Sequence, residues 1–162
     1  MTGAGSIDLV SGSSQHTESL GERLGRAAGP NEVFALWGEL GAGKTVLARG
    51  IAAGLGIDPT DISSPTFIIF REHNGGRLPL FHVDLYRLEG ADLASTGWEE
   101  CLEAGGVTVI EWADRAGDAL PGDRLDVRLE HVAETQRRVE LTATGPRSAR
   151  IVEELRSNVA RA

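Results

Sequence analysis

The chain has few of the residues and segments that mark several common classes of protein. Cys101 is the only cysteine among 162 residues, so no disulfide can form within the chain and no cluster of cysteines can hold a metal. No apolar run approaches the roughly 20 residues that a membrane-spanning helix needs. Residues 1–6 have neither a basic segment nor an apolar core, so we expect no secretory signal and a cytoplasmic protein.

Positive charge is also scarce. The formal net charge is −8, with 16 Lys and Arg residues against 24 Asp and Glu residues. A protein that binds a nucleic acid tightly by itself needs a broad basic surface to neutralise the phosphates. We therefore expect no tight binding of RNA or DNA by this chain alone. Among its basic residues, Lys44 is the only lysine.

That lysine lies in a glycine-rich segment between an apolar run and a helical pattern. Residues 33–37 are apolar, residues 38–45 read Gly-Glu-Leu-Gly-Ala-Gly-Lys-Thr, and Leu47, Ile51 and Leu55 follow at four-residue spacing. This pattern is a phosphate-binding loop in its strand-to-helix context. The glycines let backbone N–H groups surround a polyphosphate, and the helix adds its positive end. The predicted phosphate site comprises Gly38, Glu39, Leu40, Gly41, Ala42, Gly43, Lys44 and Thr45.

Lys44 and Thr45 have separate predicted roles in this loop. Lys44 is expected to bridge the β- and γ-phosphates as a compact point charge, which the planar guanidinium of arginine would not replace. The Thr45 hydroxyl is expected to coordinate Mg²⁺. We expect adenine as the base, because the Asn-Lys-x-Asp motif that selects guanine needs a second lysine, which the chain lacks.

Two carboxylates end apolar runs further along the chain. Asp84 follows residues 80–83, and Glu111 follows residues 107–110. Both are expected at the sheet edge beside the phosphate loop, where an acid can hold the magnesium shell or orient the attacking water. We assign the metal to Glu111, through water, and leave Asp84 on either the metal shell or the nucleophilic water. Spacing alone does not divide these roles.

Two residues near these motifs, Thr66 and Trp112, have two interpretations each, and a third, His82, has one. Thr66 can sense the γ-phosphate or lie in an ordinary Ser-Pro turn. Trp112 can stack near the nucleotide or pack in the core. His82 alternates with core residues, and we interpret it as structural.

The phosphate loop, together with the hydrophobic pattern, predicts a P-loop NTPase-like three-layer α/β domain, with a mixed, mainly parallel central sheet and antiparallel strands at its edge. Residues 1–162 are expected to form one domain, with residues 1–6 as a flexible tail. Ser14 or Thr17 is expected to cap the first helix. The predicted strands cover residues 7–10, 33–37, 67–70, 80–84, 107–110, 124–132 and 138–144. One helical pattern begins behind residues 14–17, and others cover residues 44–55, 89–103 and 151–159.

Four motifs together resemble the TsaE (YjeE) family of ATPases, which help to make threonylcarbamoyladenosine on tRNA. They are the phosphate loop, residues 64–67 (Ser-Pro-Thr-Phe), residues 82–87 (His-Val-Asp-Leu-Tyr-Arg) and residues 111–112 (Glu-Trp), in the family's order. The resemblance implies that ATP binds the loop, that Thr45 and Glu111 hold Mg²⁺, and that Asp84 is needed for activity. It also implicates residues beside the nucleotide from an early and a late segment, namely Ser14, Thr17, Arg137 and Arg138.

The resemblance also implies partners. Family members act with TsaD-like and TsaB-like proteins, which perform and scaffold the transfer, while the ATPase hydrolyses ATP slowly and resets the assembly between turnovers. An acidic subunit of this kind reaches tRNA only through those partners. Two alternatives stay open on the residues alone: a small-molecule kinase that uses the same loop, and an ATP-sensing module without significant hydrolysis.

Overall fold

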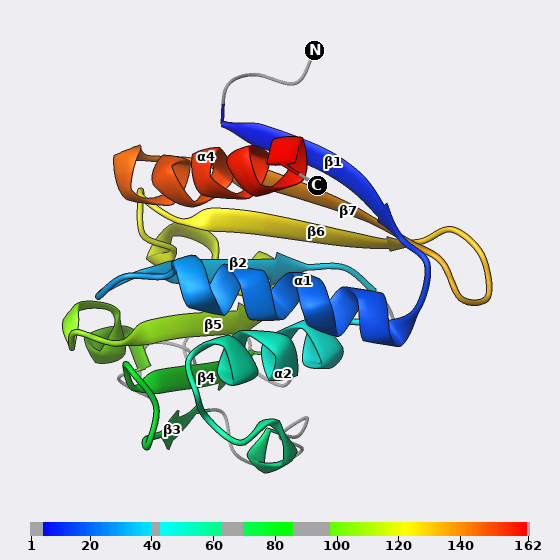
Figure 1. Ribbon diagram of the computed structural model, residues 1–162. Coiled ribbons are helices and arrows are strands. Elements are labelled where there is room, and N and C mark those ends of the chain that lie inside the picture. The colour runs from blue at the N-terminus through cyan, green and yellow to red at the C-terminus, as the bar shows by residue number, and fades with distance from the viewer. Residues whose placement is uncertain (1–4, 40–42, 63–69, 86–97, 162) are drawn as a thin grey trace.

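A seven-stranded mixed sheet organises the structure, a computed structural model that describes residues 5–39, 43–62, 70–85 and 98–161 (Figure 1). Neighbouring strands follow the order β1-β7-β6-β2-β5-β4-β3. The contacts of β2 with β5 and β6, and of β4 with β5, are parallel, whereas the outer pairs are antiparallel. The strands are β1 (Ser6–Ser11), β2 (Val33–Trp37), β3 (Phe70–His73), β4 (Leu80–Asp84), β5 (Val107–Glu111), β6 (Leu125–His131) and β7 (Arg137–Ala143).

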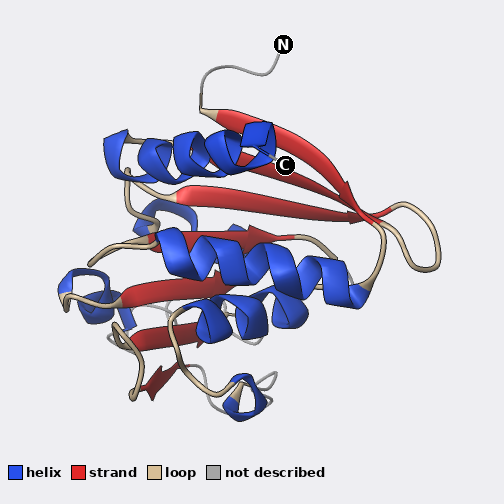
Figure 2. Cartoon of the chain, viewed as in Figure 1, coloured by secondary structure: helices blue, strands red, loops and turns tan. Residues whose placement is uncertain are grey.

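The α-helices of the described residues lie on one face of this sheet (Figures 1 and 2). Helices α1 (Ser14–Ala27) and α2 (Lys44–Gly54) run side by side in front of the centre of the sheet, and α4 (Pro146–Arg161) covers the strands β7 and β1. Short 3₁₀ helices complete the described elements: η1 (Pro59–Asp61), η2 (Trp98–Glu103), η3 (Ala113–Arg115) and η4 (Gly117–Ala119).

Strand β2 is buried on both faces, which explains its uninterrupted apolar sequence. Phe34 and Leu36 pack into the core beneath the helices, while Val33 and Ala35 pack on the opposite face. That second cluster also contains Trp98 and residues of the 3₁₀ helices. The sheet therefore has a hydrophobic layer on each side, as the sequence predicted.

The carboxyl ends of three parallel strands meet at one edge of the sheet. Glu111, at the end of β5, has Leu36 of β2 as its Cα partner on one side and Asp84 of β4 on the other. Strand β2 leads at this edge to the loop that precedes α2. The register thus places both predicted acids on neighbouring strands at the edge where the phosphate loop begins.

Two expectations about the start of the chain were wrong. The first helix is capped by Ser13, whose Oγ accepts a hydrogen bond from the His16 N–H, so Ser14 and Thr17 lie inside the first turn. Ser6 belongs to β1, where its Cα partner is Thr142, and not to a tail. In both cases the helix or strand begins earlier in the chain than the hydrophobic pattern indicates.

Two other elements overlap only partly with the residues that the structure describes. The strand expected at residues 67–70 is described from Phe70 and continues to His73, and residues 67–69 lie outside the described residues. Of the helix expected over residues 89–103, the described part is the 3₁₀ helix η2. In the described ranges, none of the helices combines the length and the apolar character needed to span a bilayer.

Candidate functional site

Lys44 is the first residue of α2 and is 5% exposed. Its Nζ donates hydrogen bonds to the backbone oxygens of Gly38, at 2.6 Å, and Glu39, at 2.8 Å. Burial lowers the pKa of Lys44 below its ordinary value, and the carboxylates of Glu111 and Asp84 act in the opposite direction. The only lysine in the chain is therefore held within the predicted phosphate loop, facing acids.

The loop enters α2 through a residue that has to be glycine. Gly43 has a φ of 107°, a conformation that L side chains rarely adopt. It is the N-terminal cap residue of the helix, and its backbone oxygen accepts a hydrogen bond from the Leu47 N–H. Residues 40–42, the centre of the predicted loop, lie outside the described residues.

Thr45 and Glu111 meet across the gap between α2 and β5. The Thr45 Oγ1 donates to Glu111 Oε1 at 3.2 Å, and the other carboxylate oxygen of Glu111 lies 2.5 Å from His82 Nε2. Glu111 and His82 are 2% and 1% exposed. The sequence identified Thr45 and Glu111 as partners at one site, but it assigned His82 a purely structural role and missed this contact.

The oxygen atoms gathered here suit Mg²⁺ chemically. Hard cations of this kind bind through one or two carboxylates, a hydroxyl, waters and substrate phosphates. The Thr45 hydroxyl and the Glu111 carboxylate are in contact, and buried Asp84 is next to Glu111 in the sheet. Within the described ranges, no three His, Cys, Asp or Glu side chains form a metal cluster of their own. The side chains present fit a Mg²⁺ that also binds waters and substrate phosphates.

Trp112 belongs to this site and not to the core alone. Its backbone takes the left-handed conformation, with φ 60° and ψ 46°, immediately after β5. Lys44 Nζ lies 4.1 Å from the centre of a Trp112 ring, a cation–π contact. The indole therefore forms one wall of the space around the ammonium.

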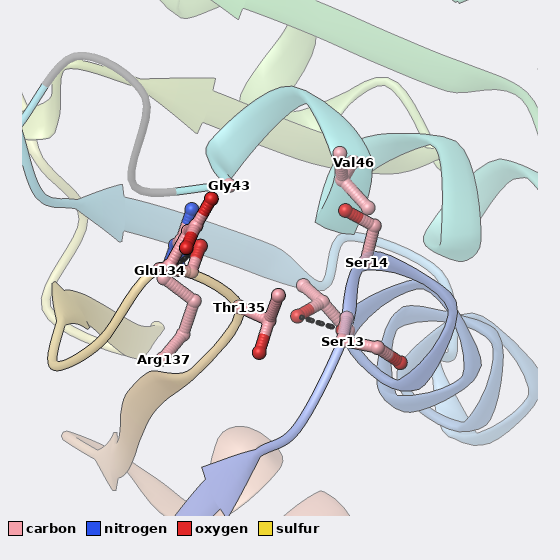
Figure 3. A pocket seen from close by; sticks show the side chains of 8 residues that line it. Ser13, Ser14, Gly43, Val46, Glu134, Thr135 and Arg137 are labelled. Atoms are coloured by element: carbon pink, nitrogen blue, oxygen red, sulfur yellow. Dashed lines mark hydrogen bonds between the residues drawn. The ribbon is translucent and has the colours of Figure 1, made fainter.

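A pocket of about 220 Å³ adjoins the start of α2 (Figure 3). Figure 3 shows its lining side chains coming from three segments: the start of α1, the start of α2, and the hairpin that joins β6 to β7. The structure thus brings together three residues that the family resemblance implicated, Ser14, Thr17 and Arg137. Sequence reasoning missed the other lining residues, since no motif marks them: Ser13, Val46, Glu134 and Thr135.

Arg138, which the family resemblance also implicated, does not line this pocket. The Arg138 guanidinium forms an ion pair with Asp8 on β1, with 2.5 Å between Nη2 and Oδ2, and is not among the residues that line the pocket. The reason is the alternation of side chains along β7, which sends neighbouring residues to opposite faces of the sheet. Thr66 lies outside the described residues.

The lysine at a helix start and the acids at parallel strand ends place this chain in the class of P-loop NTPase-like α/β domains. Within this class, the chain matches one family over most of its length. The family model for "Threonylcarbamoyl adenosine biosynthesis protein TsaE" matches residues 11–139. The chain belongs to the TsaE family, whose members take part in tRNA threonylcarbamoyladenosine biosynthesis.

Relatives and a solved structure agree with this family. The tRNA threonylcarbamoyladenosine biosynthesis protein TsaE of Bacillus subtilis strain 168 is 38% identical over 141 residues, which cover 87% of this chain and 88% of the relative. The protein of the same name from Mycobacterium tuberculosis strain H37Rv is 38% identical over 154 residues, 90% of each chain. The crystal structure of Bacillus subtilis YdiB has a TM-score of 0.81 and 32% identity, covering 95% of this chain and 96% of that one.

Proposed function

We propose that the chain binds Mg-ATP and hydrolyses it in support of tRNA threonylcarbamoyladenosine modification, driving or resetting an assembly of TsaB-like and TsaD-like proteins. One observation carries the proposal: the buried Lys44 ammonium lies at the same sheet edge as the hydrogen-bonded pair Thr45 and Glu111. A buried cation, a hydroxyl and a carboxylate in this arrangement are what phosphate and its metal need. Membership in the TsaE family supplies the tRNA context.

Each residue has one task in this proposal. Lys44 exchanges the backbone oxygens of Gly38 and Glu39 for the β- and γ-phosphate oxygens. Thr45 and Glu111 supply oxygen ligands for Mg²⁺, directly or through water, and Asp84 orients the metal shell or the attacking water. Bound Mg²⁺ stabilises the negative charge that develops on the phosphates. Positioning and electrostatics then account for the catalysis, since phosphoryl transfer requires little covalent chemistry from the protein.

The adenosine half of ATP is assigned to the pocket between α1, α2 and the β6–β7 hairpin. The pocket adjoins Gly43, so a nucleotide whose phosphates follow the loop would extend into it. Its volume of about 220 Å³ is below the roughly 300–1,000 Å³ of pockets that enclose a whole ligand, which suits one part of a nucleotide. Ser14, Thr17 and Arg137 supply polar groups for the base or the ribose.

The proposal includes partner proteins because the chain carries a net negative charge. With a net charge of −8, the chain is poorly suited to hold tRNA alone. An ATPase whose docking on TsaB-like and TsaD-like proteins depends on its nucleotide state can still act on the modification cycle. Turnover by the isolated chain is expected to be slow, with partners raising it, as when a GTPase receives a catalytic group in trans.

The test is a reconstitution with TsaB, TsaD and tRNA that measures phosphate release and modified tRNA over several turnovers. Lys44→Met should abolish binding of ATP, because it removes the ammonium without adding bulk. Glu111→Ala should still bind ATP but lower phosphate release by about 100-fold or more, the usual cost of removing a group that stabilises the transition state. Glu154→Ala, an exposed position on α4, serves as the matched control and should behave as the wild type.

The outcomes separate this function from the two alternatives. A phosphorylated small molecule formed in proportion to ADP would identify a kinase. Wild-type phosphate release and tRNA modification by Glu111→Ala would show that hydrolysis is not the function, and would leave an ATP-sensing module. Failure of the wild type to bind ATP would overturn the proposal altogether.

A further inference from the structure

His82 makes a contact that its position in a buried strand does not require. It lies on β4 two residues before Asp84, and its Cα partner on β5 is Val109. Its imidazole reaches past that partner to the carboxylate two residues further along, with 2.5 Å between Nε2 and Glu111 Oε2. Diagonal contacts of this kind need long side chains and a fixed register. The imidazole and the carboxylate are both almost fully buried.

We propose that His82 is a positioning residue for Glu111. The hydrogen bond from His82 to one carboxylate oxygen of Glu111 keeps the other oxygen directed to Thr45. The inference rests on the proposed function of Glu111 as a ligand to the magnesium shell. The two oxygens of Glu111 are divided between two partners: Oε2 faces His82, and Oε1 accepts from the Thr45 hydroxyl. A carboxylate held at both oxygens cannot rotate without losing one of these bonds.

The direction of the hydrogen bond follows from the chemistry of the two groups. An ionised carboxylate only accepts hydrogen bonds, so the proton in this contact belongs to His82 Nε2. Among the described residues, His82 Nδ1 is buried and has no hydrogen-bond partner, which fits a ring that carries its proton on Nε2. Ligands of metal ions are commonly oriented by such outer partners, whose loss weakens metal binding by about 10–100-fold.

A purely structural histidine explains the same position less well. Burying a ring nitrogen without a partner costs free energy, and an apolar side chain would avoid that cost. The neighbours of His82 in β4, Phe81 and Val83, are apolar and buried. Among the residues that the structure describes, the interaction that distinguishes a histidine from a leucine at this position is the hydrogen bond to Glu111.

The experiment measures how Mg²⁺ changes the affinity for the non-hydrolysable ATP analogue AMP-PNP, by calorimetry with and without EDTA. His82→Leu should weaken Mg²⁺-dependent binding by about 10-fold or more while leaving the affinity in EDTA unchanged. His82→Gln, which keeps an N–H donor on a side chain of similar reach, should restore most of the Mg²⁺ effect. Thr108→Val is the control, since it removes a buried hydroxyl of β5 that contacts Cys101 and not Glu111.

Each outcome decides the inference. Wild-type Mg²⁺ dependence in His82→Leu would overturn the positioning role and leave the proposed function intact. Equal loss of affinity in EDTA and in Mg²⁺ would identify a general structural role and would also overturn it. If the wild type bound no AMP-PNP, the proposed function would fail, and this inference with it.

A second measurement does not depend on how the variants fold. The imidazole ¹⁵N chemical shifts of the wild-type protein at pH 7 report which ring nitrogen carries the proton. We expect the Nε2–H form for His82, with a change in its Nε2 shift in Glu111→Ala. A proton on Nδ1, or no response to Glu111→Ala, would contradict the hydrogen bond on which the proposal depends.

Discussion

Lys44 occupies a position that favours function over stability. Its ammonium is buried against two backbone oxygens, and burial lowers its pKa. The two accepting groups belong to a loop in which Glu39 is exposed, so water could replace the lysine there. A buried charge with replaceable partners is typical of a residue kept for a ligand, and it imposes a cost on the folded state.

Lys44→Met should therefore fold at least as well as the wild type in the absence of nucleotide. We expect its free energy of unfolding in urea to be equal or higher, by up to about 2 kcal/mol, because a buried ammonium is replaced by an apolar side chain of similar length. Arg77→Met is the control: the Arg77 guanidinium donates to the backbone oxygens of Gly25 and Ala28 at the end of α1, so its loss should destabilise. A loss of more than about 1 kcal/mol in Lys44→Met would contradict the expectation.

At the level of single residues, the sequence predicted what local motifs encode. Lys44 and Thr45 follow from the phosphate-loop pattern, and Glu111 from its place at the end of an apolar run. The contact of His82 with Glu111 did not follow, because it depends on the register between β4 and β5, and alternation along one strand reports only burial. The same limit applies to Trp112, whose ring meets Lys44 only after the chain has folded.

Helices α1 and α2 touch through their backbones. A Cβ added at Gly25 of α1 would lie 2.2 Å from the Ile51 oxygen, and one added at Gly50 of α2 would lie 2.1 Å from the Glu18 oxygen. Gly21 and Gly54 are equally constrained. These helices also carry two walls of the candidate nucleotide pocket at their N-terminal ends. The glycines thus set the separation of the two walls.

Gly25→Ala should destabilise the protein, although alanine is the better helix former by about 1 kcal/mol. The added methyl group would overlap the α2 backbone, which can yield only if the two helices separate, so we expect a loss of about 1–3 kcal/mol or more in urea-induced unfolding. Gly122→Ala is the matched control, since nothing lies within 4 Å of its added Cβ. Equal stability of the two variants would contradict the close approach of the helices.

At the level of elements, the sequence predicted where the strands lie in the chain better than it predicted which strands and helices lie next to one another. The four-residue spacing of Gly21 and Gly25 is readable, but nothing local indicates which helix they face. Likewise, β6 and β7 were correctly predicted as antiparallel strands, whereas the parallel contact of β6 with β2 joins segments far apart in the chain. Such contacts are decided by the global packing of the apolar faces, which a single segment does not encode.

At the scale of the whole molecule, one buried acid lies where several elements converge. Glu32 precedes β2, is 0% exposed, and has no hydrogen-bond partner for either side-chain oxygen among the described residues. Burial raises the pKa of Glu32 to about 7, opposed by Arg147 and Arg150 of α4 and reinforced by Asp123. The charge of Glu32 therefore interacts with charged groups where the start of β2 meets α4.

Because the pKa of Glu32 is raised in the folded state, the protein should lose stability as the pH rises. The folded pKa of Glu32, about 7, lies above the ordinary value of 4.5, so the folded state holds a proton that the unfolded state releases between these values. Each pKa unit corresponds to about 1.4 kcal/mol, so up to about 3 kcal/mol is lost from pH 4.5 to pH 7 and slightly above. The contribution of Glu32 is thus greatest in mild acid and smallest above pH 8.

Glu32→Gln removes this titration while keeping the shape of the side chain, so it should be more stable than the wild type at pH 8 by about 1–3 kcal/mol and nearly equal at pH 5. Urea unfolding at pH 5, 6, 7 and 8 would measure the difference. Glu154→Gln changes an exposed acid on α4 and should keep the wild-type pH dependence, which separates the effect of burial from that of net charge. If Glu32→Gln and the wild type lost stability in parallel over this range, the buried carboxyl would not be its source, and the coupling between β2 and α4 would have to lie in other groups.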